Sequence, residues 1–188
     1  MINRNTLLAA AAGVAACAAA APASGSVMVV GNSHARICFE AADSPRHPMV
    51  ADIRRCDEAL SRSDLTANDT VATHVNRGIL RLRRGLVDLA ISDFDRAIAL
   101  DPDQPEAYLN KGAAVLRREN ADEAVSLFTI ALERNTTRPA LAHYGRAVAN
   151  ETLGHLNAAY RDYTAASRID PRWSEPRQEL TRFRVVSR

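Results

Sequence analysis

The chain has 188 residues, with 24 basic and 22 acidic side chains and a formal net charge of +2, which suits one domain of ordinary size. A hydrophobic content of 47% argues against disorder throughout, and the near-neutral charge argues against a nucleic-acid binder, whose affinity comes mainly from neutralising phosphates. The alanine-rich, aromatic-poor composition favours packed helices over a β-sandwich.

Residues 1–23 have the three-part pattern of a secretory signal peptide. One positive charge, Arg4, precedes an uncharged apolar run over residues 6–21, and small residues occupy the two positions that a signal peptidase reads. The run is shorter than the roughly 20 residues that span a bilayer, and no other segment could span one. We predict cleavage near Ala23 and export to the periplasm or secretion. The alternative is a lipoprotein box ending at Cys17, which would make the protein an outer-membrane lipoprotein.

The remaining two cysteines are candidates for a disulfide. Removal of Cys17 leaves Cys38 and Cys56, and an even pair in an oxidising compartment favours a bridge. On the chain-entropy model, such a bridge stabilises by about 3 kcal/mol. Two buried free thiols are the alternative, whereas two cysteines without clustered His or Asp do not complete a tetrahedral metal site.

An internal repeat of 34 residues organises the rest of the chain. Residues 71–104, 105–138 and, after an inserted Pro139, 140–173 align with one another. Small residues and one aromatic recur at fixed places, as expected where two helices cross closely: Gly78, Gly112 and Ala147 in the first helix of each repeat, and Ala90, Phe94 and Ala97, Ala124, Phe128 and Ala131, or Ala159, Tyr163 and Ala166 in the second. Each repeat is therefore predicted to be a pair of helices.

Glycine marks the turn inside two of the repeats. Gly85 and Gly154 fall between the two helices, where a left-handed conformation is easy. Glu119 replaces glycine in the second repeat, and we expect a less favourable turn there.

These motifs resemble the tetratricopeptide repeat (TPR) family, most strongly in "NRG…A…F…A…DP" and "NKG…A…F…A". The resemblance covers residues 71–173. It implies an all-α fold, a right-handed α-solenoid of helix-turn-helix repeats with helical caps, whose usual work is binding other proteins.

The flanks are interpreted as caps, which terminal repeats need to cover their apolar faces. Residues 33–66 resemble a degenerate repeat with helices at 33–43 and 51–60, which a Cys38–Cys56 bridge would tie together. Residues 174–185 are predicted to form a last helix. The apolar stretch 27–30 either packs on the N-terminal cap or is disordered.

No arrangement of residues indicates catalysis, a cofactor or a metal. Phosphate loops, dinucleotide fingerprints, nucleophile elbows and zinc-protease helices are missing from the sequence. His74 and His143 fall at equivalent places in the first and third repeats, and we interpret them as packing residues.

The resemblance places a partner-binding groove on the first helices, which line the concave face of a TPR array. The side chains expected to face it are mostly apolar with an arginine rim: Val75, Asn76, Ile79, Leu82, Arg83, Leu109, Asn110, Ala113, Leu116, Arg117, Tyr144 and Val148. In peptide-binding relatives, an Asn at the place of Asn76 and Asn110 holds the ligand's backbone. An apolar helix or an extended segment is the expected ligand. The alternative is that these residues bury against the chain's own termini or a second copy.

The sequence therefore predicts an exported, non-enzymatic module that binds a protein or peptide partner. A self-associating or lipid-anchored envelope scaffold is the alternative.

Overall fold

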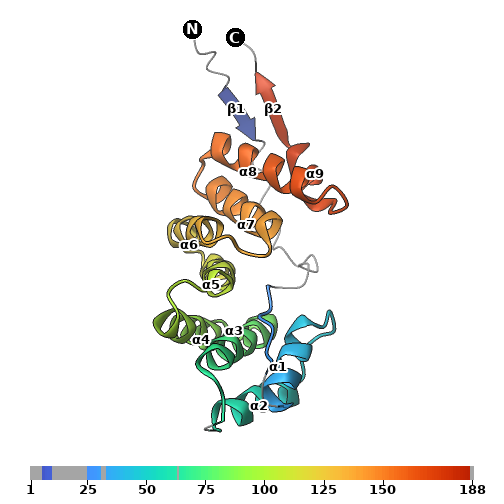
Figure 1. The fold of residues 1–188 in the computed structure, drawn as a ribbon. Helices are drawn as coiled ribbons and strands as arrows, with labels where there is room; N and C mark the ends of the chain where they lie inside the picture. Colours follow the sequence, from blue (N-terminus) through green and yellow to red (C-terminus); the bar gives the residue numbers. More distant parts are fainter. Residues whose placement is uncertain (1–5, 10–24, 31–32, 63, 187–188) are drawn as a thin grey trace.

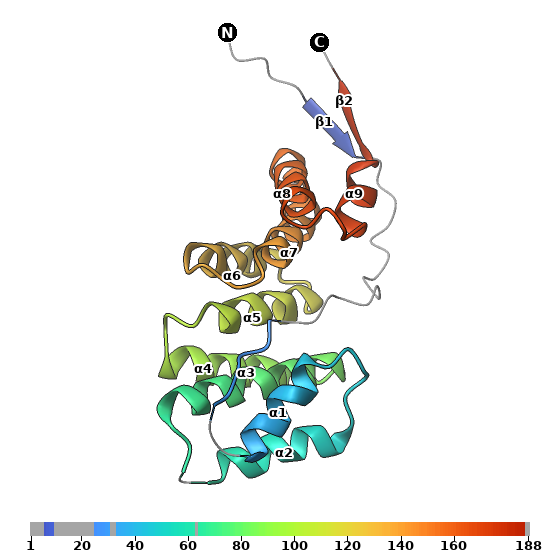
Figure 2. The same cartoon turned by 45° about the vertical axis from the view of Figure 1, so that its right-hand side comes forward.

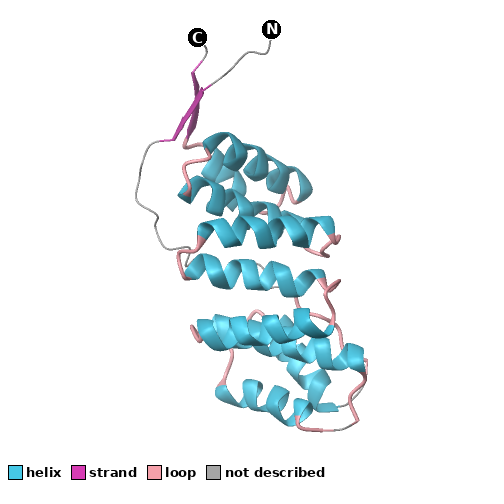
Figure 3. Ribbon diagram, turned by 90° about the vertical axis from the view of Figure 1, so that its left-hand side faces the viewer, coloured by secondary structure: helices cyan, strands magenta, loops and turns pink. Residues whose placement is uncertain are grey.

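The computed structural model describes residues 6–9, 25–30, 33–62 and 64–186. Helices form almost all of this part and stack in pairs along one direction (Figures 1 and 3). Their bounds are α1 (Ser33–Asp43), α2 (Val50–Leu60), α3 (Ala67–Arg83), α4 (Val87–Leu100), α5 (Pro105–Arg117), α6 (Ala121–Glu133), α7 (Pro139–Thr152), α8 (Leu156–Ile169) and α9 (Glu175–Leu180).

The predicted all-α fold and its helix pairs are confirmed. Pairs α3–α4, α5–α6 and α7–α8 correspond to the three repeats, and α1–α2 to the degenerate repeat before them. Helix α3 begins at Ala67, four residues before the predicted repeat, because Thr66 caps it by accepting a hydrogen bond from the backbone N–H of Asp69.

Close approach of paired helices explains the small residues. A Cβ atom added to Gly78 would lie 2.4 Å from Cε1 of Phe94, and one added to Gly112 would lie 3.0 Å from Cε1 of Phe128. Each aromatic ring thus packs closely against the backbone of the paired helix, as the repeat pattern predicts. Gly145 approaches Phe128 in the same way, since a Cβ atom added to Gly145 would lie 2.4 Å from Cζ of Phe128. This ring is therefore held between α5 and α7.

The turns inside the repeats need a left-handed residue. Gly85 and Gly154 adopt φ values of 78° and 75°, as predicted. Glu119 stands at the same place in α5–α6 with φ of 60°, and Asn135 ends α6 with φ of 57°. A side chain with a Cβ atom is less stable in this conformation than glycine.

The N-terminal helix pair is joined by a disulfide between Cys38 and Cys56. Both cysteines are fully buried and belong to one core cluster with Val75 and Ile79 of α3. The bridge therefore lies where the small-residue packing signature of the later repeats is missing.

The C-terminal cap is shorter than predicted. Helix α9 ends at Leu180, and the chain continues as strand β2 (Phe183–Val186), where we expected helix to residue 185. Strand β2 pairs antiparallel with β1 (Thr6–Ala9), Thr6 opposite Val186, beside α9 (Figure 1).

The predicted signal peptide is only partly described. Strand β1 falls inside it, whereas residues 10–24, with Cys17, lie outside the described residues. Among the helices described, none is long and apolar enough to cross a membrane.

Candidate functional site

Helices α1, α3, α5 and α7, the first of each pair, form the inner face of the stack. Residues 25–30, hereafter the N-terminal segment, run along this face from α5 across α3 toward α1 (Figure 2). The segment forms no helix or strand of its own, and its backbone polar groups are free to bond with side chains of the inner helices.

Two asparagines on successive inner helices hold the backbone of the N-terminal segment. The side-chain Oδ1 of Asn76 accepts from the N–H of Val27 at 2.9 Å, and its Nδ2 donates to the carbonyl of the same residue at 2.8 Å. One repeat later, Nδ2 of Asn110 donates to the carbonyl of Gly25 at 3.1 Å. Both asparagines are buried. We call this pair the asparagine clamp. Its members are the residues that the family resemblance assigned to a ligand's backbone.

A third polar contact comes from the first turn of α3. Oδ1 of Asp69 accepts from the N–H of Val30 at 3.2 Å, and the Asp69 side chain is buried. Asp69 was not among the predicted site residues, because in the sequence it is only an acidic residue in the first turn of a helix.

Side chains of the N-terminal segment alternate between the protein and solvent. Val27 packs on the core cluster that contains Val75 and Ile79, and Val29 is buried with residues of α1 to α3. Met28 is 71% exposed and Val30 90% exposed. This period of two is that of an extended chain with one face covered.

The apolar stripe predicted for the groove is largely closed in the first two repeats. Val75 and Ile79 are fully buried and Leu109 is 1% exposed, whereas the stripe was expected to face a partner. Helix α1 and the N-terminal segment cover these side chains, which is the alternative that the sequence left open. Ala113, Leu116, Tyr144 and Val148 are half-buried on the same face.

The arginine rim contacts the protein's own backbone. Arg83 donates to the carbonyls of Ala42 at 3.2 Å and Ser44 at 2.7 Å, and also bonds that of Arg46. The Ala42 carbonyl lies in the last turn of α1, where helix acceptors lack intrahelical partners, and Ser44 and Arg46 follow the helix. Arg117 donates to the carbonyl of Leu82 at 2.8 Å. The Leu82 residue is buried. Both arginines thus connect neighbouring inner helices.

Aromatic and charged residues close the inner face at its C-terminal end. Tyr144 packs against Tyr163 and Trp173, with ring centroids 5.5 and 4.8 Å apart. Tyr163 donates to Glu151 at 2.9 Å, and Arg182 makes an ion pair with the same carboxylate at 2.8 Å. Burial and the neighbouring Glu151 charge raise the pKa of Tyr163, so its hydroxyl stays protonated as a donor.

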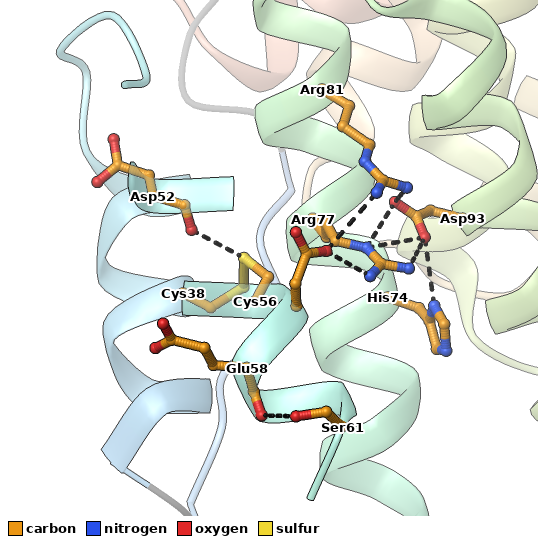
Figure 4. A network of polar contacts seen from close by, with 10 residues as sticks. Cys38, Asp52, Cys56, Glu58, Ser61, His74, Arg77, Arg81 and Asp93 are labelled. Carbon is orange, nitrogen blue, oxygen red and sulfur yellow. Dashed lines mark hydrogen bonds and ion pairs between the residues drawn. A yellow bond between two sulfur atoms is a disulfide. The ribbon is translucent and has the colours of Figure 1, made fainter. Parts of the chain in front are cut away.

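An ionic cluster centred on the buried Asp93 joins α2, α3 and α4 behind this face (Figure 4). Arg77 bonds Asp93 at 2.6 Å and Asp57 at 2.7 Å, and Arg81 reaches Asp93 at 2.8 Å. Nδ1 of His74 lies 3.3 Å from the Asp93 carboxylate. Burial alone would raise the pKa of Asp93, but the hydrogen bonds from His74 and Arg77 and the arginine charges outweigh it and hold that pKa below its usual value.

The third repeat carries the same His–Arg–Asp arrangement. His143 and Arg146 each bond Asp162 at 2.8 Å. Burial opposes these hydrogen bonds here too, and the pKa of Asp162 is again lowered. The interpretation of the two histidines as packing residues becomes more specific: each faces a buried aspartate. No group of three or more potential metal-binding side chains occurs in the described part of the chain.

Neither ionic cluster was predicted, although the sequence contains a pattern that indicates them. His, Arg and Asp recur with the same spacing in the first and third repeats, at 74, 77 and 93 and at 143, 146 and 162. The second repeat has Tyr108, Lys111 and Leu127 at these places, so the spacing is seen only when alternate repeats are compared.

A family model described as "Tetratricopeptide repeat" matches residues 75–139 and 114–172. Together the two matches cover more than half of the chain. The chain belongs to the tetratricopeptide repeat family. The match indicates no enzymatic family.

Solved TPR structures have the same fold. A crystal structure of MamA is 23% identical, with a TM-score of 0.60, and the match covers 69% of this chain and 72% of MamA. The first TPR of Spaghetti (RPAP3), bound to the HSP90 peptide SRMEEVD, is 22% identical with a TM-score of 0.58 over 64% of this chain and 94% of that one. The second TPR domain of human RPAP3, in complex with the HSP70 peptide SGPTIEEVD, is 24% identical with a TM-score of 0.57 over 62% and 96%.

Proposed function

We propose that this TPR protein is a non-catalytic interaction module whose inner face binds an extended segment of a protein partner. The observation that carries the proposal is the asparagine clamp, in which Asn76 and Asn110 bond the backbone of an extended chain. Side-chain amides that bond backbone groups hold a chain without depending on its side chains. Membership of the TPR family, and the two TPR neighbours whose structures contain bound peptides, support the same reading.

The remaining open part of the inner face can extend the contact. Ala113, Leu116 and Val148 are half-buried apolar side chains on α5 and α7, beyond the point where the N-terminal segment meets Asn110. A partner segment that continues along these helices would cover them and gain affinity from apolar burial.

Site-specific photocrosslinking in the native host tests this function. A photoreactive residue is introduced at Ala113 or Val148 on the inner face and, as a control, at the exposed Ser92 on the outer helix α4. We expect a discrete adduct with one partner from the inner positions and none from Ser92. Adducts that form only from Ser92, or from no position, would refute binding at the inner face.

We also propose export, with cleavage near Ala23. The charged start and apolar run of residues 1–23 support it, and so does the disulfide between two buried cysteines, since disulfides persist in oxidising compartments. Mass spectrometry of the protein from its host should give a chain that begins near Ser24. A lipidated Cys17 would instead favour the anchored scaffold, and an intact Met1 would contradict both.

A further inference from the structure

We propose that the asparagine clamp recognises extended segments of the pattern Gly-x-Val-x-Val, and that the chain's own residues 25–30 are a built-in competitor which such a partner segment displaces. This inference rests on the proposed function, because it names the ligand class of the same face. The N-terminal segment shows what the clamp accepts: an extended backbone whose alternate residues face the protein.

The spacing of the contacts defines a register. Gly25 bonds Asn110 and Val27 bonds Asn76, so the segment advances two residues for each repeat and runs opposite to the order of the repeats. Every second residue of an extended chain points to the same side. The positions equivalent to residues 25, 27 and 29 therefore face the protein. Between them, Met28 is mostly exposed, and Ser26 donates an exposed hydrogen bond to Asp43 at 2.7 Å.

Each inward position selects a particular size. A Cβ atom on Gly25 would lie 3.1 Å from Cγ of Glu106 and 3.2 Å from Cδ2 of Leu109, so this place admits glycine and resists larger residues. Val27 and Val29 contact apolar clusters, where β-branched side chains suit an extended backbone. The pattern Gly-x-Val-x-Val thus follows from the surroundings of the three positions.

Displacement of the N-terminal segment is favoured by its small anchorage. Its polar contacts to the inner helices are the bonds to Asn76, Asn110 and Asp69 and an exposed bond from Ser26 Oγ to Asp43 at 2.7 Å. Two of its large apolar side chains, Met28 and Val30, are mostly exposed. A partner segment with the same inward residues makes the same contacts. The apparent affinity of the partner segment falls as the protein's own segment occupies the clamp in a larger fraction of the molecules.

The test uses the full chain and a fluorescent, N-acetylated peptide of residues 25–32, GSVMVVGN. Gly25→Val in the chain weakens the protein's own segment and is expected to tighten peptide binding by about tenfold. The same glycine-to-valine change in the peptide is expected to weaken its binding by about tenfold, because the valine of the peptide then clashes at the place that admits glycine. Met28→Val, at an outward position, is the matched control in both molecules and should change neither affinity.

A second variant guards against misfolding of the first. Val27→Pro in the chain removes the N–H that Asn76 accepts and should also tighten peptide binding, with circular dichroism unchanged. Equal affinity for wild type and both variants would overturn the competition. Failure of the peptide to bind any of the three chains would overturn the ligand class, while photocrosslinks from Ala113 or Val148 would still uphold the proposed function.

Discussion

The side chain of Asn76 makes two hydrogen bonds to one residue, accepting from the N–H of Val27 and donating to its carbonyl. The two residues are 49 positions apart in the chain. This pairing imitates what a neighbouring β-strand would offer an extended backbone. It fixes the N-terminal segment to the one helix that also carries the buried side chains Val75 and Ile79.

Replacing Asn76 with alanine should release the N-terminal segment. Val27 would lose both backbone partners at a part-buried site, at a cost of about 1–3 kcal/mol. We expect faster hydrogen exchange of the Val27 amide and a lower free energy of unfolding in urea. Asn68→Ala, at an exposed position of the same helix, should leave both unchanged. Exchange at Val27 as slow as in the wild type would contradict the clamp.

The repeats could be predicted from sequence because their signal is local. Gly78 and Phe94 lie 16 residues apart within one helix pair, and the same pairing returns every repeat, so pattern and packing coincide. The left-handed turns at Gly85 and Gly154 were predictable for the same reason. The last helix was predicted too long, because residues 183–186 pair with a strand 174 to 180 positions away.

The occupied clamp could be predicted only in part. The family resemblance singled out Asn76 and Asn110, but residues 25–30 carry no local pattern that would direct them to these side chains. The bond from Asn110 to Gly25 spans 85 positions. Long-range contacts of this kind depend on the complete stack, which places Val27 against α3 and Gly25 against α5.

Gly78→Ala should destabilise the first repeat. The new Cβ would lie 2.4 Å from the Phe94 ring, and the ring is fully buried and cannot move away without disturbing the core. We expect a loss of about 1–3 kcal/mol in the free energy of unfolding, measured in urea. The exposed Ser92→Ala on α4 is the control, and an unchanged or raised midpoint for Gly78→Ala would disprove the close crossing.

Glu119→Gly should stabilise the second repeat. Glu119 is exposed and holds φ at 60°, a conformation that costs a residue with a Cβ about 1–2 kcal/mol. Glycine relieves this strain but adds freedom to the unfolded chain, so the expected net gain is about 0.5 kcal/mol. Ser126→Gly, at an exposed position in the middle of α6, should destabilise in the same thermal unfolding experiment. Loss of stability in both variants would contradict strain at residue 119.

Acid should weaken the ionic cluster of the first repeat. The pKa of Asp93 is lower in the folded protein than its ordinary value of 3.8, so its stabilising effect is complete above that pH and is lost as the pH falls below it. Asp93→Asn leaves Arg77 and Arg81 without their buried partner, and we expect a loss of about 3 kcal/mol at pH 7. The variant should also show a shallower fall in stability below pH 4.

The control for Asp93 is Asp88→Asn. The Asp88 side chain is 80% exposed and faces an exposed Arg118, a pair of the kind that contributes little to stability. Urea unfolding of the three proteins from pH 2 to pH 7 should give the wild-type profile for Asp88→Asn. A profile for Asp93→Asn that runs parallel to the wild type at low pH would show that Asp93 does not carry the acid sensitivity.

Reduction of the disulfide should destabilise the N-terminal pair. Cys38 and Cys56 are 18 residues apart in sequence, and closing a loop of this length stabilises by about 3 kcal/mol through the unfolded chain. We expect dithiothreitol to lower the unfolding midpoint of the wild type but not that of a Cys38→Ala/Cys56→Ala double variant. Thiol titration of the unfolded, unreduced protein from its host should detect neither of these cysteines. Two reactive thiols would refute the bridge, and with it the support that it gives to export.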